Sequence, residues 1–401
     1  MMEKPRSATH RRDFLKFLGL SSLPLLWPLP GRAGGLAGNP GTDEESERTV
    51  SFVGDSLMLS PAAYVRTLQK INETKPVEPD FYGEGGVTRQ LEEAFAKLTG
   101  KEKAVFMPTG TMANQLALKM LNGDNTKVMV PENSHLYRDE ADAAQSVHRQ
   151  RLVPVGTGKP YFGLADLKET IAYYDEGEVF RSGLGTVAVE NPVRRADGTA
   201  VPLRDIQEIF AYCREKGYKL HLDGARLPIA SAFTGVSVAE YASYFDTVYI
   251  SLYKYLNAAG GAVLCGNADL IDRMAHQVKI HGGTVFQTWG SAAMALHYLP
   301  GMEERWKNVA RAAARLTAAL NKIPGVRVTA VPTGTNIYDM TLAPEIHLKK
   351  LADILYGEYD MWLGRPDGQG IVKFTVNESL LRREPQEMAD AWKKAVAQAR
   401  K

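Results

Sequence analysis

Cysteine is scarce in this sequence. Its 401 residues include two, Cys213 in a helical pattern and Cys265 in a strand-like apolar run. Two thiols cannot build a disulfide framework, and no cysteines or histidines stand at the spacing of a metal centre. We therefore expect no metal site, and we expect both cysteines to pack as small apolar side chains.

An excess of one sign of charge is also missing. The chain has 48 Lys and Arg against 46 Asp and Glu, a formal balance of +2. Residues 1–35 carry six of the basic residues and two of the acids, so the rest of the chain has a balance of −2. This composition indicates no nucleic-acid surface.

The N-terminus lacks an apolar run long enough for a transmembrane helix. Its uncharged run, residues 17–31, is short and interrupted by prolines. The run follows Arg11-Arg12 in a pattern close to the twin-arginine export signal. We predict a signal peptide at residues 1–35, a linker at residues 36–48 and a periplasmic protein that is exported folded and has no membrane attachment after cleavage. An uncleaved N-terminal anchor is the alternative.

Internal repeats and low-complexity tracts are absent as well. Instead, short apolar runs typical of buried strands alternate with amphipathic segments of helical period. This rhythm predicts an α/β fold with a large parallel-type sheet covered on both faces. The pattern changes near residue 300, so we predict a large cofactor-binding domain at residues 49–300 and a smaller α+β domain at residues 301–401. The main predicted helices are 88–98, 112–121, 164–174, 203–216 and 303–323, with a last helix from residue 385; the main predicted strands are 104–107, 128–130, 152–155, 186–189, 218–222, 326–330 and 337–340.

One lysine stands where a charge is expensive. Lys254 lies between an apolar strand through Val248 and Ile250 and a second apolar strand at residues 262–265. Burial there lowers the pKa of a lysine towards that of a nucleophilic amine, which forms Schiff bases. Asp223 ends another apolar strand 31 residues earlier, so both side chains can meet at one edge of a parallel sheet. An amine and a carboxylate placed this way suit pyridoxal 5′-phosphate (PLP), although a buried ion pair is the alternative.

Other polar residues follow the predicted strands at the same edge. Thr109, Gly110 and Thr111 begin a helix, and their hydroxyls and N–H groups could bind one phosphate, although a capped helix start looks the same. His135 could lie on a pyridine ring and exchange protons, or could be a surface histidine. Arg226 is a planar cation that could take oxygens of the cofactor or of a substrate.

Several segments together resemble a known family. The chain is similar to the L-threonine aldolase and β-eliminating lyase family of PLP enzymes, which has the aspartate aminotransferase fold (fold type I). The resemblance covers roughly residues 82–299. The segments that carry it are Thr109-Gly110-Thr111-Met112-Ala113-Asn114-Gln115, His135 to Glu140, His221-Leu222-Asp223-Gly224-Ala225-Arg226, Ser251 to Gly261, and Gly282-Gly283-Thr284-Val285-Phe286-Gln287.

The resemblance implies a role for each candidate. Lys254 bonds the cofactor aldehyde, Asp223 partners the pyridine nitrogen and His135 stacks on the ring. Thr109, Gly110 and Thr111 bind the phosphate, while Arg226 anchors the ring oxygen or the substrate carboxylate. Family members are homodimers or homotetramers that share sites across an interface, so we expect a homo-oligomer.

The chain also departs from the family pattern around the substrate. Val193 stands where family aldolases carry a histidine for the substrate hydroxyl, and Tyr253 precedes the lysine in place of a small hydroxyl residue. Phe286 replaces one arginine, and Lys373 replaces the C-terminal arginine of the carboxylate clamp. We expect a rebuilt, more aromatic substrate pocket in which Tyr253, Phe286, Arg226 and Lys373 contact the substrate.

The expected activity is that of a carbon–carbon lyase. We predict a PLP-dependent enzyme that splits a β-hydroxy-α-amino acid, threonine aldolase-like, into glycine and an aldehyde. β-Elimination or racemisation is an enzymatic alternative, because neither needs a hydroxyl-binding histidine. A periplasmic protein that only binds the cofactor or an amino acid is the non-enzymatic alternative.

Overall fold

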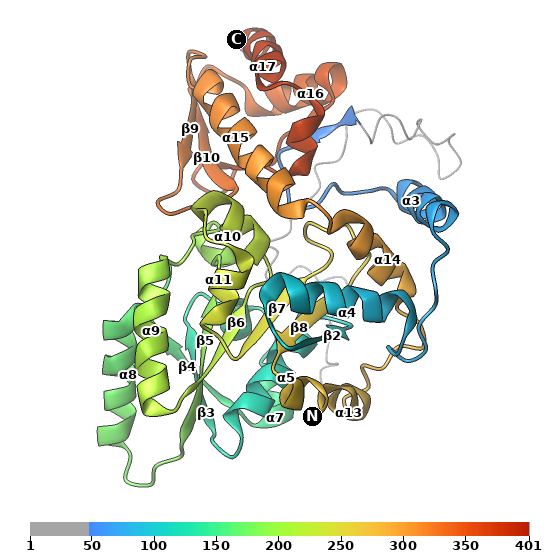
Figure 1. Ribbon diagram of the computed structural model, residues 1–401. Helices are drawn as coiled ribbons and strands as arrows, with labels where there is room; N and C mark the ends of the chain where they lie inside the picture. The colour runs from blue at the N-terminus through green and yellow to red at the C-terminus, as the bar shows by residue number, and fades with distance from the viewer. Residues whose placement is uncertain (1–47, 401) are drawn as a thin grey trace, which may run out of the picture.

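The computed structural model describes residues 48–400, so the predicted signal peptide and nearly all of the predicted linker lie outside the described residues. A large sheet forms the centre of the molecule, and a smaller group of helices and strands lies at one end of it (Figure 1). Of the helices in this described part, none has both the length and the apolar character needed to cross a bilayer.

Seven strands form the large sheet in the order β2-β8-β7-β6-β5-β3-β4. β3 to β7 run parallel to one another, whereas β8 is antiparallel to both β7 and β2. The strands are β2 (Lys103–Met107), β3 (Lys127–Pro131), β4 (Arg151–Val155), β5 (Leu184–Glu190), β6 (Lys219–Asp223), β7 (Thr247–Ser251) and β8 (Ala262–Gly266).

Apolar cores cover both faces of this sheet, as its sequence pattern predicts. In β7, Val248 and Ile250 pack into the larger core with Phe95, whereas Tyr249 packs on the other face with Leu116. This division follows from the alternation of side chains along a strand. The helices of this part of the chain are α3 (Pro61–Thr74), α4 (Gly86–Thr99), α5 (Gly110–Asn122), α6 (His135–Arg138), α7 (Ala143–His148), α8 (Leu164–Gly177), η1 (Arg194–Ala196), α9 (Leu203–Lys216), α10 (Leu227–Thr234), α11 (Val238–Ser243), α12 (Ala268–Ile271), α13 (Met274–Ile280) and α14 (Trp289–Tyr298).

The remaining elements gather around a second, antiparallel sheet of order β12-β10-β9. Phe52 stacks on Phe374 with ring centroids 4.3 Å apart, and Trp392 meets both rings edge-on, so the first described residues are anchored to the last helix. The elements are α15 (Met302–Leu320), β9 (Val326–Ala330), β10 (Ile337–Leu342), α16 (Leu348–Tyr359), β11 (Met361–Trp362), β12 (Val372–Thr375), η2 (Glu378–Arg382) and α17 (Pro385–Ala399). β1 (Val50–Ser51), which lies within the range predicted for the large domain, pairs with β11.

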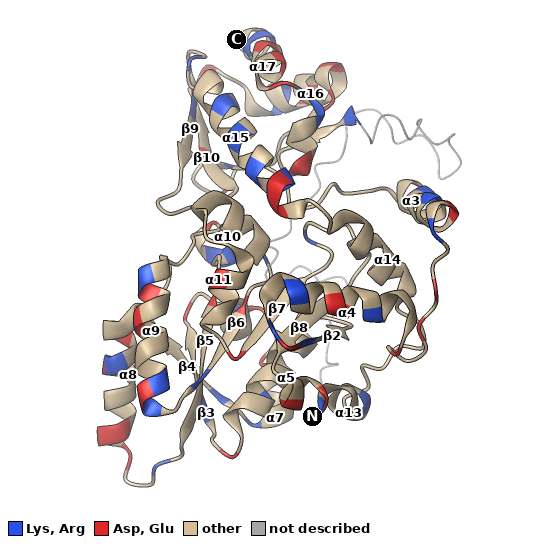
Figure 2. Cartoon of the chain, in the orientation of Figure 1, with Lys and Arg blue, Asp and Glu red and all other residues tan. Residues whose placement is uncertain are grey.

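Charges of both signs are interspersed on the outer helices, as Figure 2 shows for α8, α9 and α15. This distribution agrees with the balanced composition of the sequence. Cys213 and Cys265 are buried free thiols, which confirms their predicted place in the core. Burial raises the pKa of each thiol to about 12, so neither is a reactive thiolate at neutral pH.

Candidate active site

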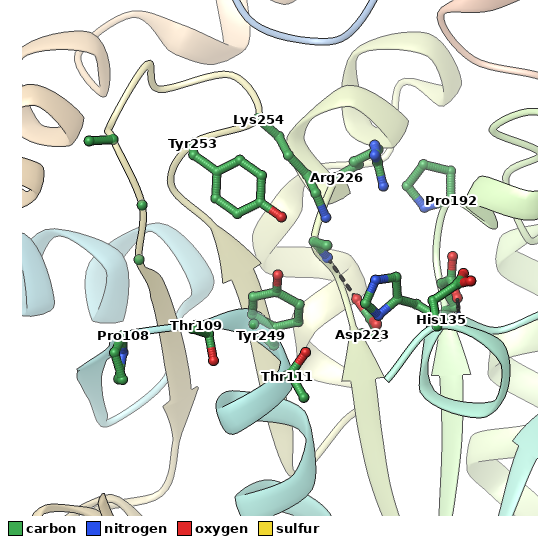
Figure 3. A pocket seen from close by; sticks show the side chains of 17 residues that line it. Pro108, Thr109, Thr111, His135, Pro192, Asp223, Arg226, Tyr249, Tyr253 and Lys254 are labelled. Carbon is green, nitrogen blue, oxygen red and sulfur yellow. Dashed lines mark hydrogen bonds between the residues drawn. The ribbon is translucent and has the colours of Figure 1, made fainter. Parts of the chain in front are cut away.

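A cavity of about 420 Å³ opens at the carboxyl ends of β5, β6 and β7 and at the start of α5. Figure 3 shows Lys254, Asp223, His135, Arg226, Tyr253, Thr109 and Thr111 turned towards this one space. Strand ends of an α/β sheet are the usual place for a ligand, because the loops there are free to carry polar groups. The full lining is Pro108, Thr109, Gly110, Thr111, His135, Asp139, Glu190, Pro192, Asp223, Ala225, Arg226, Tyr249, Tyr253, Lys254, Ala259, Gly260 and Gly261.

Lys254 follows β7 in the turn that leads to β8. Burial, helped by the positive charge of Arg226, lowers the pKa of Lys254 to about 7, although Asp223 acts in the opposite direction. Near neutral pH a large share of Lys254 is therefore a free amine. A free amine in a closed cavity can attack an aldehyde, which is the property that the sequence predicted.

Asp223 is the last residue of β6 and is almost fully buried. Its Oδ2 atom accepts a hydrogen bond from Asn114 Nδ2 at 3.0 Å, and its Oδ1 atom accepts one from the backbone N–H of Ala225 at 3.1 Å. These two donors hold the carboxylate at the floor of the cavity, opposite Lys254 (Figure 3).

His135 begins α6 and is oriented by two acids. Its Nδ1 atom lies 2.9 Å from Glu140 Oε1, and its backbone N–H donates to Glu190 Oε2 at 2.6 Å. Burial disfavours the charged imidazole, but the Glu140 hydrogen bond and the Asp223 charge outweigh it, so the pKa of His135 is raised. Because Nδ1 is engaged, Nε2 is the ring nitrogen that can exchange a proton with a ligand.

His135, Glu140 and Asp223 lie close enough together to form a candidate cation site. One ligand atom from each of His135, Glu140 and Asp223 lies within 4.8 Å of the others. However, Asn114 Nδ2 already donates to both carboxylates, at 2.8 Å and 3.0 Å, and Glu140 already binds the imidazole. An amide N–H thus occupies the position where a cation would bridge the acids.

Glu190, at the end of β5, was not identified from the sequence. Burial and the nearby Asp223 raise its pKa to about 7, although backbone N–H groups of Arg194 and His135 donate to it. A carboxyl group that titrates near neutral pH inside a cavity is a candidate for proton transfer. Like Asp223, Glu190 is the last residue of an apolar strand, and this position was the signal available in the sequence.

The first turn of α5 fits a phosphate. Thr109 caps the helix, with its hydroxyl accepting from Met112 N–H at 3.1 Å. Within the described residues, the N–H groups of Gly110 and Thr111 have no hydrogen-bond acceptor and lie at the positive end of the helix dipole. A Cβ at Gly110 would lie only 2.0 Å from the Tyr249 hydroxyl, so the glycine gives this tyrosine its room.

Arg226 is held by a partner that the sequence did not suggest. Its Nε atom donates to Asp55 Oδ2 at 2.7 Å, and Asn336 Nδ2 donates to the other oxygen of Asp55 at 3.1 Å. In the described part of the chain, the terminal N–H groups of Arg226 have no hydrogen-bond acceptor. These groups are available for an anion in the cavity.

A second arginine was also missed. Arg194, in the short helix η1, lies two residues after the cavity-lining Pro192. Burial and the neighbouring charge of Arg226 lower the pKa of the Arg194 guanidinium, and Asp55 opposes this change. Among residues 48–400, the guanidinium of Arg194 has no hydrogen-bond acceptor. The two arginines are therefore neighbouring cations near Asp55 and Glu190, and among the described residues only Arg226 has a carboxylate hydrogen-bonded to its guanidinium.

Two of the predicted substrate residues do not line this cavity. Lys373 Nζ lies between Asp339, at 2.7 Å, and Asp197, at 2.9 Å, so both of its close partners are acids of the chain itself. Phe286 is 54% exposed and packs edge-on against Phe81 and Tyr82. The other predicted site residues, Lys254, His135, Asp223, Thr109, Gly110, Thr111, Arg226 and Tyr253, all line it.

Comparisons with known proteins agree with the family resemblance seen in the sequence. The profile of the family described as beta-eliminating lyase matches residues 66–343. The chain is similar to the low-specificity L-threonine aldolase of Candida albicans, with 34% identity over 218 residues, which are 54% of this chain and 58% of that protein. The chain thus spans little more than half the length of this curated relative.

Solved structures give the fold. The chain resembles a protein of Exiguobacterium sp. 255-15 named for both aromatic amino acid beta-eliminating lyase and threonine aldolase, with a TM-score of 0.74, 25% identity, and coverage of 89% of this chain and 99% of that one. It also resembles serine palmitoyltransferase of S. paucimobilis with a bound PLP–myriocin aldimine, with a TM-score of 0.61, 14% identity and 88% of each chain covered. These likenesses confirm the predicted fold type I.

Proposed function

The chain belongs to the beta-eliminating lyase family, and from this membership we propose that it is a PLP-dependent lyase that cleaves a β-hydroxy-α-amino acid to glycine and an aldehyde. The observation that carries the proposal is the meeting of Lys254 and Asp223 in one cavity with the N–H groups of Gly110 and Thr111 at the start of α5. An amine, an acid and an anion site are the three groups that this cofactor requires.

The residues present fit the cofactor. The neutral amine of Lys254 can bond its aldehyde, Asp223 can hold its ring nitrogen protonated, and Gly110 and Thr111 can donate to its phosphate. When bound, PLP supplies an electron sink for the bond that breaks at the substrate α-carbon. The chain itself positions the substrate, orients Asp223 through two hydrogen bonds and moves the protons.

Arg226 and Arg194 can hold the substrate carboxylate. Arg226 is fixed by Asp55 and keeps its terminal N–H groups free, and Arg194, whose pKa is lowered by burial and by the charge of Arg226, adds a second guanidinium near it. A paired, oriented cation of this kind binds a carboxylate through two hydrogen bonds. This assignment replaces Lys373, which is bound by Asp339 and Asp197.

Two groups can take the proton of the substrate hydroxyl. His135 has Nε2 available, and Glu190 titrates near pH 7 at the same side of the cavity. Either can serve as a general base near neutral pH, since the best catalytic base has a pKa close to the working pH.

β-Elimination is a second candidate, favoured by one observation. Val193, which stands where family aldolases carry a hydroxyl-binding histidine, is fully buried. A site without the hydroxyl-binding histidine of the family aldolases selects less strongly for aldol cleavage.

One assay separates the two reactions. Purified protein loaded with PLP is incubated with L-threonine, L-phenylserine and L-serine, and glycine, aldehyde and 2-oxo acid are quantified. Aldol cleavage predicts glycine and aldehyde in equal amounts, whereas elimination predicts a 2-oxo acid and ammonia. Lys254→Ala is the control and is expected to form neither set of products. Absence of both from the unchanged protein would contradict the proposal and would favour a binding protein.

We also propose that the protein is exported to the periplasm by the twin-arginine route, already folded. The support is the Arg11-Arg12 pair ahead of the uncharged run at residues 17–31. Replacing both arginines with lysine is expected to keep the protein in the cytoplasm, which fractionation and immunoblotting detect. Normal processing of that variant would contradict export by this route.

A homo-oligomer is the last part of the proposal. Apolar side chains at the surface support it, because Phe81, Tyr82 and Phe286 are each more than half exposed and touch one another. Light scattering of the mature protein is expected to give a dimer or tetramer mass, and a monomer mass would contradict it.

A further inference from the structure

One buried amide joins the two acids of the site. Asn114 lies on α5, is fully buried and does not line the cavity. Its Nδ2 atom donates to Glu140 Oε1 at 2.8 Å and to Asp223 Oδ2 at 3.0 Å. Both hydrogens of the amide are thus used on carboxylates: Glu140, which binds His135, and Asp223, which would serve the cofactor nitrogen.

The orientation of this amide is determined by a chain of partners behind it. Two carboxylates can only accept, so the nitrogen of Asn114 must face them and its oxygen must face His221. His221 Nε2 lies 3.0 Å from that oxygen and must carry the hydrogen. His221 Nδ1 then accepts from the Thr247 hydroxyl, 2.8 Å away.

His221 can bridge the Thr247 hydroxyl and the Asn114 oxygen because it stays neutral. It is fully buried, and burial lowers its pKa to about 4 although Asp223 is near. A neutral imidazole with one donor and one acceptor nitrogen fits between a hydroxyl and an amide oxygen, whereas a charged imidazole would have to donate at both nitrogens. The tautomer is therefore imposed by the two neighbours.

The amide of Asn114 is one of two groups that stabilise the charged form of Glu140, and His135 is the other. Burial raises the pKa of Glu140, and its Oε2 atom is buried without a hydrogen-bond partner among the described residues. Only Oε1 is stabilised, by Asn114 and by His135. Loss of the amide would remove one of the two donors and favour the protonated, neutral acid.

We propose that Asn114 is a positioning residue: locked by Thr247 and His221, its amide holds the carboxylates of Asp223 and Glu140 side by side and so links His135 to the acid that would serve the cofactor nitrogen. The inference rests on the proposed PLP function for its meaning, but its geometry belongs to the chain alone. The charged groups that face His135 are Glu140, Asp223, Glu190, Asp139 and Lys254.

The test uses the mature protein without cofactor, labelled with ¹⁵N-histidine, so that its result is independent of any activity. NMR of the ring nitrogens between pH 5 and 9 reports the tautomer of His221 and the titration midpoint of His135, each assigned by a His→Gln variant. In the unchanged protein we expect His221 to be neutral with hydrogen on Nε2 throughout. In Asn114→Leu we expect the His135 midpoint to fall by at least about half a pH unit, because Glu140 is no longer held ionised.

A matched control separates positioning from general damage. Asn377 is also fully buried and also donates through Nδ2 to two acceptors, but to backbone carbonyl groups of Ser51 and Gly54. Asn377→Leu is expected to leave the His135 midpoint and the His221 tautomer unchanged.

Thr247→Val provides a second variant that changes little volume and touches neither acid. It is expected to shift the Nδ1 resonance of His221 to that of an unbonded nitrogen and to lower the His135 midpoint by a smaller amount, even if Asn114→Leu does not fold. The proposal is overturned if His221 carries its hydrogen on Nδ1, or if the His135 midpoint stays constant in every folded variant. If the NMR spectra are as expected but the protein is inactive towards amino acids, the proposed function is overturned and the role of Asn114 stands.

Discussion

Arg226 Nε donates to Asp55 Oδ2 over 2.7 Å, although the two residues are 171 positions apart in the sequence. Both side chains are mostly buried, with 15% and 11% exposure. The pairing lowers the pKa of the Asp55 carboxyl despite its burial and raises the pKa of the guanidinium. The first described segment of the chain thus fixes the residue that we assign to the substrate carboxylate.

We expect Asp55→Asn to lower stability and weaken substrate binding together. Removing one partner of a buried ion pair leaves the other charge uncompensated, which typically costs about 3 kcal/mol. The Michaelis constant for the amino acid should rise roughly tenfold as Arg226 loses its fixed orientation. Urea unfolding and steady-state kinetics measure the two effects.

The exposed pair Lys103–Asp272 gives the matched control for this change. Its side chains are 48% and 59% exposed, so Asp272→Asn should alter stability by less than about 1 kcal/mol. Equal effects of the two substitutions would show that the Asp55 pair has no special role.

The rate of cofactor attachment should depend on pH through Lys254. Its pKa is lowered to about 7, so the reactive neutral amine becomes more abundant as the pH rises through this value. We expect the rate at which cofactor-free protein takes up PLP to increase with pH and to have its midpoint near 7. Stopped-flow absorbance measures the rate.

Glu190→Gln provides a check on the cause of that midpoint. The negative charge of Glu190 raises the pKa of Lys254, so its removal should move the midpoint to lower pH. A midpoint near the ordinary lysine value in both proteins would mean that Lys254 is not desolvated before the cofactor binds.

Arg194 and Lys373 should differ in their importance for the substrate carboxylate. The guanidinium of Arg194 has no hydrogen-bond acceptor in the described part of the chain, whereas Lys373 is bound by Asp339 and Asp197. We expect Arg194→Gln to raise the Michaelis constant roughly tenfold, as the loss of a charge-assisted hydrogen bond does, and Lys373→Gln to raise it by less than about threefold. The reverse order would restore Lys373 as the clamp residue.

Local patterns were enough to locate the elements and the centre of the site. The apolar period at residues 203–216 predicted α9 with the bounds that the structure has, and the strand patterns placed Asp223 at the end of β6 and Lys254 just after β7. Both predictions depend on side-chain periodicity and on where a strand ends, which are properties of a short stretch of sequence.

Long-range pairing was not accessible in this way. Nothing near Arg226 in the sequence points to Asp55, and nothing near Lys373 points to Asp197. The direction of β8 was also hidden, because an apolar run reads alike in both directions. Asn114 lay inside a motif that the sequence analysis singled out, but its role depends on His221 and Glu140, which only the fold brings to it.

Tyr253 should determine how well the enzyme accepts aromatic substrates. Of the two aromatic residues predicted to contact substrate, Tyr253 lines the cavity and Phe286 does not. We expect Tyr253→Ala to lower kcat/KM for L-phenylserine about tenfold more than for L-threonine, since an apolar contact contributes roughly 1 to 3 kcal/mol to discrimination and tenfold corresponds to about 1.4 kcal/mol. Phe286→Ala is the control and should affect both substrates alike. If Tyr253→Ala lowers kcat/KM equally for L-phenylserine and L-threonine, the Tyr253 side chain supports the site without selecting the substrate. Any preference for aromatic substrates must then come from the absence of a polar partner at Val193.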